Sequence, residues 1–539
     1  MKQYKLLSLL AGVSLMAFTS CDLEEMPTTD IGFDNNEEAV INGTNIQQFE
    51  NGLYSAFRAT QYGVYSLVPD LICDGFNETV NSGNFYGPVH RTDASFTASD
   101  QDVESIWSGY YGYMVDYNNL INDGYVKEQE AAFMADDADF VSVDAYAIRA
   151  LGVAHFFRAY TYMQLARLFA KDYDPSTAAT DLCVPLVLKY DQEEKPARAT
   201  VQQVYDQIKK DLDAANTYFT KLTTVTVELV NAGIVTSASN PYYQCYLTLN
   251  DTQPGSPNVN VNTVYALYAR YYLDTHDYPM AAQYAKSLLG QYALANSEEA
   301  MEYEYVYDEG TEPIFQMEAS LAENGSGTNS AYINGSSYPY VPTGFYLAPY
   351  YMPSGKLLAM YEGTDLRLAQ WFDFDNYFRY GNSLATGIPI FVKYYGDPNA
   401  GLNNSIVPNG RQHVKPFMIG EMYLILAEAS LQANDPTTAA QALNELQTKR
   451  GATPTAATME NIQDEWFKET VGEGLRYSCM KRWHIGFSGR PAVYPGEGIV
   501  PEGTSNTQKV MPADDDHWLL PIPAYERQLN DNLEQNPGY

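Results

Sequence analysis

Cysteine is scarce in this chain, which has five cysteines among its 539 residues. They are scattered along the sequence, and no two of them form a CxxC pair. So sparse a set excludes a disulfide framework and a cysteine-based zinc site. We therefore expect packing, rather than cross-links, to stabilise the fold. The five positions are Cys21, Cys73, Cys183, Cys245 and Cys479.

Basic residues are also few, because 32 lysines and arginines face 67 aspartates and glutamates. The formal net charge is −35 at pH 7. A surface this acidic repels phosphate backbones, so nucleic acid is excluded as a partner. After residue 20, no apolar stretch approaches the roughly 20 residues that a membrane-spanning helix needs.

The sequence motifs of catalysis and cofactor binding are missing. There is no HExxH, GxSxG or GxGxxG sequence and no phosphate-binding loop, and the six histidines are dispersed. Glu421 and Glu428 share a helical face, where we expect packing partners or a solvated face rather than an acid–base pair. Asp514, Asp515 and Asp516 indicate an acidic turn in preference to a Ca²⁺ site. We predict no catalytic residue, no metal site and no cofactor.

The first 21 residues have the pattern of an export signal. Lys2 and Lys5 precede an almost purely apolar run, residues 6–18, and Thr19-Ser20-Cys21 closes the segment. A basic start, a short apolar run and small residues describe a cleaved signal peptide, too short for a membrane span. We predict a lipoprotein signal peptide over residues 1–20 and lipid attachment at Cys21, although Phe18 stands where leucine is usual.

Aromatic residues are abundant, with 46 tyrosines, 22 phenylalanines and 5 tryptophans. Tyrosine is enriched where a ring packs on one side and its hydroxyl meets water. Asparagine and glycine accompany many of these tyrosines. Such a surface suits uncharged polyhydroxylated ligands, and it suits a large protein interface equally well.

Apolar residues recur with helical spacing in four early segments, and one helical pair occurs twice. The early segments are 37–60, 101–122, 144–170 and 200–219. A shift of 158 residues places 265–288 on 423–446, with a helix, a short polar turn and a second helix in each copy. The alanine spacing is typical of a tetratricopeptide unit, in which small residues let two helices nest.

We predict a mainly α fold: one domain over residues 21–539, built as a tetratricopeptide-like helical repeat scaffold with large loop-rich insertions. The insertions around 61–100 and 296–416 are rich in glycine, asparagine and tyrosine. Long loops on a rigid scaffold commonly carry binding sites.

Four segments together resemble the SusD/RagB family of outer-membrane nutrient-binding lipoproteins. Residues 148–169 are similar to the family's arginine-start helix, and 421–429 to its Y-L-x-x-A-E-A helix. Residues 465–483 match its E…E-G-x-R…R-W segment, with Trp466-Phe467 in place of the usual double arginine. Residues 520–539 are similar to its terminal I-P…Q-N-P-G-Y.

This resemblance implies four tetratricopeptide-like units and a partner, a SusC-like TonB-dependent transporter that the lipoprotein covers as a lid. It also implies capture of an oligosaccharide, or in some members a peptide, and its delivery to that transporter. The expected location is the outer membrane, facing the cell exterior through a lipid anchor. Asp22, Glu24 and Glu25 resemble the surface-export signal of such lipoproteins. A secreted glycoside hydrolase and a lid with little ligand affinity stay open as alternatives.

The family's ligand loops follow the first helix and lie inside the long insertion, which corresponds to 77–96 and 320–351 here. Rings that stack on sugars and side chains that hydrogen-bond hydroxyl groups are the expected site residues. In the first loop these are Asn81, Asn84, Phe85, Tyr86 and Arg91, and in the second Asn329, Tyr332, Asn334, Tyr338, Tyr340 and Tyr346.

Overall fold

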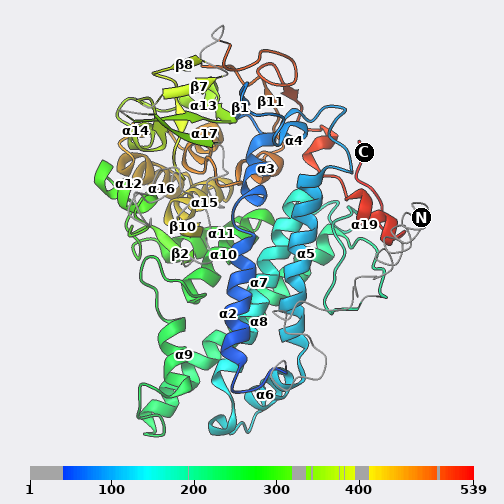
Figure 1. Cartoon of the computed structure of the whole chain (residues 1–539). Coiled ribbons are helices and arrows are strands. Elements are labelled where there is room, and N and C mark those ends of the chain that lie inside the picture. Colours follow the sequence, from blue (N-terminus) through cyan, green and yellow to red (C-terminus); the bar gives the residue numbers. More distant parts are fainter. Residues whose placement is uncertain are drawn as a thin grey trace, which may run out of the picture.

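A computed structural model describes most of the chain (Figure 1). Its described residues are 40–191, 193–317, 336–340, 344–375, 377–380, 383–394, 412–493 and 498–539, with only the backbone between 336 and 347. The signal peptide and Cys21 therefore lie outside the described residues, and so do Asn329, Tyr332 and Asn334. Among the described helices, none is long and apolar enough to cross a membrane.

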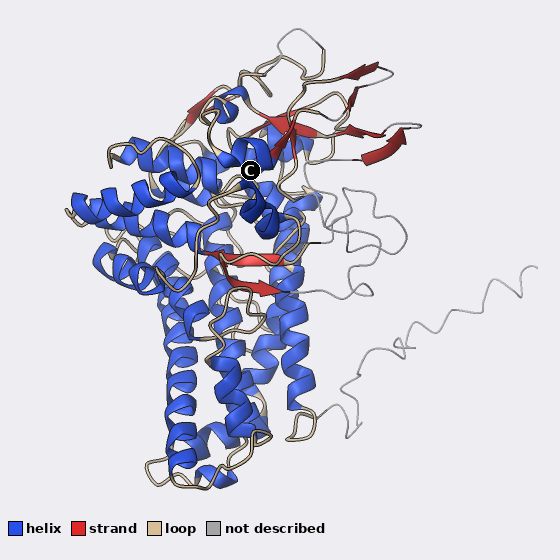
Figure 2. Ribbon diagram, turned by 90° about the vertical axis from the view of Figure 1, so that its left-hand side faces the viewer, coloured by secondary structure: helices blue, strands red, loops and turns tan. Residues whose placement is uncertain are grey.

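The mainly α prediction is confirmed, and long helices running side by side form the body of the molecule (Figures 1 and 2). Helix α7 (Ala145–Phe169) is apolar or small on nearly every side and is buried along most of its length. A helix that is apolar all round belongs at the centre of a bundle. It packs against α2 (Ile46–Ala59), α5 (Gln101–Asn122) and α8 (Val201–Asn231).

The early helices follow the sequence prediction closely, with one correction. Helix α5 has the predicted bounds, and Thr200 caps α8 in a capping box with Gln203. However, α8 continues to Asn231 instead of ending at residue 219, and a further helix, α9 (Pro241–Leu249), follows it. The apolar stripe of α8 extends through Leu222, Val225 and Leu229, all buried, which gives the longer helix its packing face.

The predicted repeat is present as two helical hairpins. Helices α10 (Val261–Asp274) and α11 (Tyr278–Leu288) form the first, and α15 (Ile419–Gln432) and α16 (Pro436–Lys449) the second. Asp277 and Asp435 accept backbone N–H groups at the start of each second helix, as their position before a proline predicts. Helix α11 packs on α15, so the two hairpins stack on one another.

Short helices and strands cover the end of the body opposite α9, and we call this region the crown (Figure 1). Strand β1 (Phe76–Glu78) pairs with β5 (Tyr351–Pro353), and a four-stranded sheet has the order β3-β4-β7-β8. Strand β2 (Pro313–Met317) pairs with β10 (Val414–Met418) beside the scaffold. The sheet strands are β3 (Ser336–Tyr340), β4 (Gly344–Ala348), β7 (Tyr377–Tyr380) and β8 (Ser383–Ala385). The other elements are α3 (Val64–Ile72), α4 (Gly87–Arg91), α6 (Gly124–Met134), α12 (Glu298–Tyr305), α13 (Gly355–Leu358), α14 (Leu366–Trp371), α17 (Met459–Glu469), α18 (Arg476–Arg482), α19 (Ala524–Leu529), β6 (Phe372–Asp373), β9 (Ile390–Phe391), β11 (Phe487–Ser488) and β12 (Val510–Met511).

The motif charges are buried ion pairs that join distant segments. Arg270 pairs with Glu421 at 2.6 Å, and Arg482 pairs with Glu428 at 2.8 Å, so both glutamates are packing partners. Arg476 pairs with Asp74 at 3.0 Å. The spacing of Glu469, Glu473 and Arg476 would place them on one helical face and predicts an ion-pair network among them. That prediction is wrong, because α17 ends at Glu469 and α18 begins only at Arg476.

Candidate ligand-binding face

The two segments predicted to bind ligand are brought together by β1 and the strand that pairs with it. In the antiparallel register, Glu78 lies opposite Tyr351. Beyond β1, the Thr79 N–H donates to the Tyr350 carbonyl at 2.9 Å. The Asn81 amide donates to the Arg379 carbonyl at 2.6 Å and so fastens the loop to β7. We call residues 79–91, Tyr350 and strands β7 and β8 the upper face.

Buried hydrogen bonds hold the loop of the upper face from below. The Asn506 side chain accepts from the Glu78 N–H and donates to the Glu78 carbonyl, both at 3.0 Å. The His90 Nδ1–H donates to the Leu71 carbonyl at 2.8 Å, and Nε2 of the same ring accepts from the Arg490 guanidinium at 3.1 Å. Burial, with the adjacent Arg490 guanidinium, holds the pKa of His90 well below its usual value, so this ring is a neutral structural group.

Three aromatic rings gather at the tip of this loop. Phe85 is 43% exposed, which is unusual for so large an apolar side chain. Its ring centroid lies 4.4 Å from that of Tyr86 and 5.3 Å from that of Tyr350. The Tyr351 hydroxyl donates to the Phe85 carbonyl at 2.7 Å and fixes the backbone beneath the ring. The ring of Phe85 is therefore held in place from below and exposed to solvent on its other side.

Arg91 is the hub of the polar groups in the same loop. Its guanidinium lies 3.1 Å from Glu78, 3.2 Å from Asp93 and 2.6 Å from Asn84 Oδ1. Gly87 makes room for this arrangement, since a Cβ there would lie 2.4 Å from Asn84 Oδ1 and 2.5 Å from Arg91 Nη1. Among the five candidates of the first loop, Arg91 therefore contacts Asn84 and Phe85 contacts Tyr86, while Asn81 bonds to β7.

The loop backbone is strained at non-glycine residues. Asn84, Tyr86 and Thr92 have φ values of 69°, 56° and 42°. Left-handed φ is uncommon for residues with a Cβ and costs about 1–2 kcal/mol each. Strain of this kind gathers at sites where surrounding contacts overdetermine the backbone, as they do here.

Strand register adds an aromatic row that the sequence analysis identified only in part. Tyr338 lies opposite Tyr346, and Tyr346 opposite Tyr377, across three neighbouring strands. Tyr340, which ends β3, lies opposite Gly344. Tyr377 is 38% exposed, as is Phe374 just before it. The sequence analysis named neither of these two nor Tyr350, because their strand partners became visible only in the fold.

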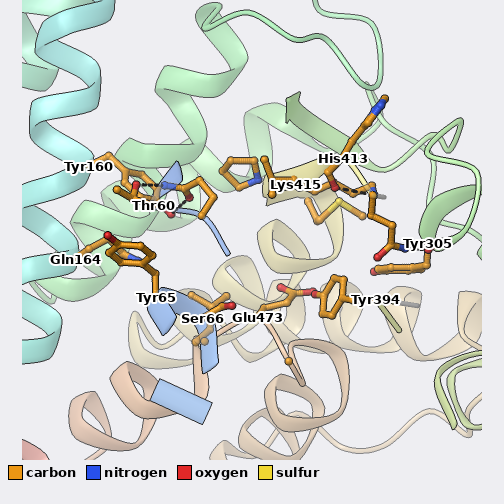
Figure 3. Close-up of a pocket in the computed structure, with 18 of the residues that line it drawn as sticks. Thr60, Tyr65, Ser66, Tyr160, Gln164, Tyr305, Tyr394, His413, Lys415 and Glu473 are labelled. Carbon is orange, nitrogen blue, oxygen red and sulfur yellow. Dashed lines mark hydrogen bonds between the residues drawn. The ribbon is translucent and has the colours of Figure 1, made fainter. Parts of the chain in front are cut away.

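A polar cavity of about 90 Å³ lies below, between the helical body and the crown (Figure 3). Tyr65, Tyr160 and Gln164 line one side, and Tyr305 and Lys415 the other. Its lining also includes Tyr394 and Gln412, which flank a segment outside the described residues. Sequence patterns do not predict this cavity, since its walls come from seven separate parts of the chain.

Two carboxyl groups near the cavity have altered acidity. Burial raises the pKa of Glu473, and the ammonium group of Lys393, 2.7 Å away, opposes that rise. Asp70 packs against the turn that carries Glu473, and burial raises the pKa of Asp70 to about 7. The charge of Glu473 adds to the rise at Asp70, so the two carboxyl groups influence one another. In the part of the chain that the structure describes, no group of three His, Cys, Asp or Glu side chains could hold a metal ion.

Comparison with known proteins gives a consistent result. A SusD family model matches residues 379–539, and a second model, "Starch-binding associating with outer membrane", matches residues 34–228. No curated protein sequence matches the chain significantly.

Solved structures cover almost the whole chain at low sequence identity. A SusD superfamily protein from Bacteroides thetaiotaomicron is 21% identical, with a TM-score of 0.70 over 92% of this chain and 100% of its own. A SusD-like carbohydrate binding protein from Bacteroides vulgatus is 17% identical, with a TM-score of 0.62 over 91% and 97%. Surface glycan-binding protein A from Bacteroides fluxus is 20% identical, with a TM-score of 0.63 over 93% and 100%.

Fold and site together define a helical-repeat protein with an aromatic face built from loops. Two SusD-like family models match this chain, one near its N-terminal end and one at its C-terminal end. The chain belongs to the SusD-like family.

Proposed function

We propose that this protein is a glycan-binding lipoprotein without enzymatic activity, which captures oligosaccharides at the upper face. The observation that carries the proposal is the exposed ring of Phe85 beside Tyr350, next to the polar side chains of Asn81, Asn84 and Arg91. A pyranose stacks its C–H face on an aromatic ring, while amide and guanidinium groups satisfy its hydroxyls.

The comparisons support a glycan as the ligand. One matching family model carries the words "Starch-binding" in its description, and two similar structures are named for carbohydrate or glycan binding. Tyr338, Tyr340 and Tyr346 extend the proposed binding surface along β3 and β4, and Asn329, Tyr332 and Asn334 belong to the segment that leads into β3.

Titration calorimetry against a panel of polysaccharides tests the ligand. Replacing both Phe85 and Tyr350 by alanine should weaken binding of any bound glycan by about tenfold or more, since each stacked ring contributes roughly 1 kcal/mol. Tyr525→Ala removes a ring that is 55% exposed on α19 and serves as the matched control. Release of shorter sugars would establish a hydrolase instead, and binding of peptides alone would establish a peptide receptor.

We propose further that a lipid on Cys21 anchors the protein to the outer membrane, facing outward, and that a SusC-like TonB-dependent transporter is its partner. A cleaved signal followed by cysteine supports the anchor, and the words "associating with outer membrane" in the family description support the location.

Metabolic labelling with palmitate should mark the wild-type protein and spare Cys21→Ser. Protease treatment of intact cells should remove the protein if it faces outward. Affinity purification in detergent should recover a barrel protein of transporter size. Recovery of the barrel by a protein that binds neither glycan nor peptide would favour a lid that acts only through the transporter.

A further inference from the structure

The end of α8 and the short helix α9, which lies at the lower end of the molecule, expose large aliphatic side chains (Figure 1). Val227 and Val230 lie on the solvent side of α8 and are 43% and 39% exposed. Ile234, just past the end of α8, is 54% exposed, and Leu247 of α9 is 47% exposed. We call these four residues the apolar band. Exposed apolar residues that gather at one place on a surface indicate contact with another apolar phase.

Hydrogen bonds place α9 along the same side of α8. The Thr226 hydroxyl donates to the Tyr242 carbonyl, near the start of α9, at 3.2 Å. Just past the other end of α9, the Asn250 amide donates to the Thr223 hydroxyl at 3.5 Å. Thr223 lies about one turn before Val227, so α9 runs antiparallel to α8 on the side that carries the band. The two helices therefore form one tip.

This tip carries almost no charge. Residues 229–250 contain no charged side chain and no histidine, although charged residues make up 18% of the chain. Tyr243 and Tyr246 of this run are partly exposed, and their ring centroids lie 6.3 Å apart. Tyrosine beside aliphatic side chains is typical of the boundary between lipid tails and headgroups. In a chain of net charge −35, an uncharged tip also avoids the repulsion that an anionic lipid surface exerts on carboxylates.

The described chain begins at the same end of the molecule. Val40 is its first residue, and α2 starts a few residues later. Arg149 of α7 joins α2 to α9, since it pairs with Glu50 at 2.7 Å and donates to the Thr248 hydroxyl at 3.4 Å. Cys21 precedes Val40 by nineteen residues, which can span at most about 65 Å. A lipid on Cys21 would therefore be tethered to the end of the body that carries the tip.

We infer that the apolar band rests on the surface of the lipid bilayer into which the lipid of Cys21 inserts. The inference rests on the proposed lipid anchor and adds a second, weaker contact beside it. The four aliphatic side chains together hold about as much hydrocarbon as one myristoyl chain, which by itself binds membranes only marginally. The band therefore orients the body rather than anchoring it, and it turns the crown and the upper face away from the membrane. Asp136 and Asp137, exposed after α6, keep that part of the same end in water.

Labelling of single introduced cysteines tests this contact, because the four cysteines of the described chain are all buried and Cys21 carries the lipid. Leu247→Cys offers one accessible thiol at the tip. Leu384→Cys is the matched control, since Leu384 is 40% exposed on β8 at the opposite end. Each lipidated protein carries the fluorophore NBD on its new thiol, in vesicles of phosphatidylethanolamine and phosphatidylglycerol. We expect a spin-labelled lipid to quench the probe at the tip at least about fivefold more than the control probe.

Flotation of the vesicles reports the lipid anchor separately from the tip. Protein that floats with the vesicles but shows equal quenching of both probes would overturn the membrane contact and leave the anchor in place. Protein that does not float would overturn the anchor and the inference together. Quenching at the tip that appears only after the partner transporter is added would assign the tip to a protein and overturn the inference.

A charge within the band tests the named residues. Combined with the labelled Leu247→Cys, Ile234→Asp should lower quenching by about threefold or more, because a carboxylate enters the apolar boundary at high cost. Val510→Asp, at a position of the crown that is 55% exposed, should leave quenching unchanged. An unchanged melting temperature would show that both variants fold. Equal quenching in the two folded variants would overturn the role of the band.

Discussion

Gly474 illustrates how one residue of a family motif is required by the fold. Its φ is +72°, and a Cβ there would lie 3.1 Å from the Cα and the carbonyl oxygen of Ser66 in α3. Only glycine satisfies both the left-handed backbone and the close approach of the two segments. The turn then presents Glu473 to Lys393 and starts α18 at Arg476.

We predict that Gly474→Ala lowers the free energy of unfolding by about 2–4 kcal/mol, because it adds a steric clash to the cost of positive φ. Gly233→Ala is the matched control, since Gly233 has a φ of +68° and no atom lies within 4 Å of the position that its new methyl group would take. The control should lose only about 1 kcal/mol. Urea unfolding measures both values, and equal losses would show that the contact with Ser66 is unimportant.

The buried carboxyl group of Asp70 makes the free energy of unfolding depend on pH. Burial raises its pKa from 3.8 to about 7, and the charge of Glu473 adds to this rise. A folded-state pKa above the unfolded value means that the contribution of this group to stability is complete below about pH 4 and is lost as pH rises through 7.

Asp70→Asn removes this titration, so the variant should be more stable than the wild type at pH 8, on the order of 2–4 kcal/mol, and nearly equal to it at pH 4. Unfolding midpoints measured across this pH range test the prediction. Asp136→Asn, at an exposed position, should follow the wild type throughout. A pH-independent difference between Asp70→Asn and the wild type would contradict the assignment.

At the scale of elements, the C-terminus of α7 depends on residues far along the chain. The last carbonyls of a helix need partners, and Asn536 donates to the Phe169 carbonyl at 2.8 Å and to the Leu520 carbonyl at 2.7 Å. Lys481 donates to the Arg167 carbonyl at 2.6 Å. The terminal Q-N-P-G-Y motif is therefore a cap on the central helix.

Asn536→Ala should cost about 1–3 kcal/mol, because it leaves the buried Leu520 carbonyl without a donor and the Phe169 carbonyl with only the Arg198 guanidinium at 3.4 Å. Asn532→Ala removes a similar bond, to the Lys195 carbonyl at 2.8 Å, but at an exposed position where water replaces the donor. We expect that control to lose less than about 0.5 kcal/mol. Equilibrium unfolding in urea separates the two variants, and a loss at Asn536 no larger than the control's would refute the capping role.

At the scale of the whole molecule, one buried guanidinium connects the repeat to the segments around the crown. Arg450, which follows α16, lies 2.5 Å from Glu312 before β2 and also pairs with Glu469 at the end of α17. Arg367 of α14 pairs with the same Glu469 at 2.8 Å. These groups are almost completely buried, so the network persists only with its charges matched.

Arg450→Met should destabilise the protein by about 3–5 kcal/mol, because it leaves the buried carboxylate of Glu312 without its partner and Glu469 with Arg367 alone. Lys449→Met, at the preceding and partly exposed position, should change stability by less than about 0.5 kcal/mol. Thermal unfolding of the two variants measures both changes in stability. A small effect at Arg450 would mean that the crown is held mainly by apolar contacts.

The helical scaffold can be predicted from local signals in the sequence. These are the apolar spacing of α5, the repeat in α10–α11 and α15–α16, and the caps Asp277 and Asp435. Such signals predict helices well, because the hydrogen bonds of a helix join residues that are close in sequence. The first candidate loop can also be predicted from the sequence, because asparagine, arginine and aromatic residues lie together in residues 77–96.

Contacts between residues far apart in the sequence become apparent only in the folded chain. Asp74 with Arg476, Arg450 with Glu312, and Phe85 with Tyr350 are each separated by more than a hundred residues. No periodicity encodes such pairs, because long-range contacts depend on how whole elements pack. The commitment of Arg91 to Glu78 and Asp93 belongs to the same group, since loop strain and the space left by Gly87 set its geometry.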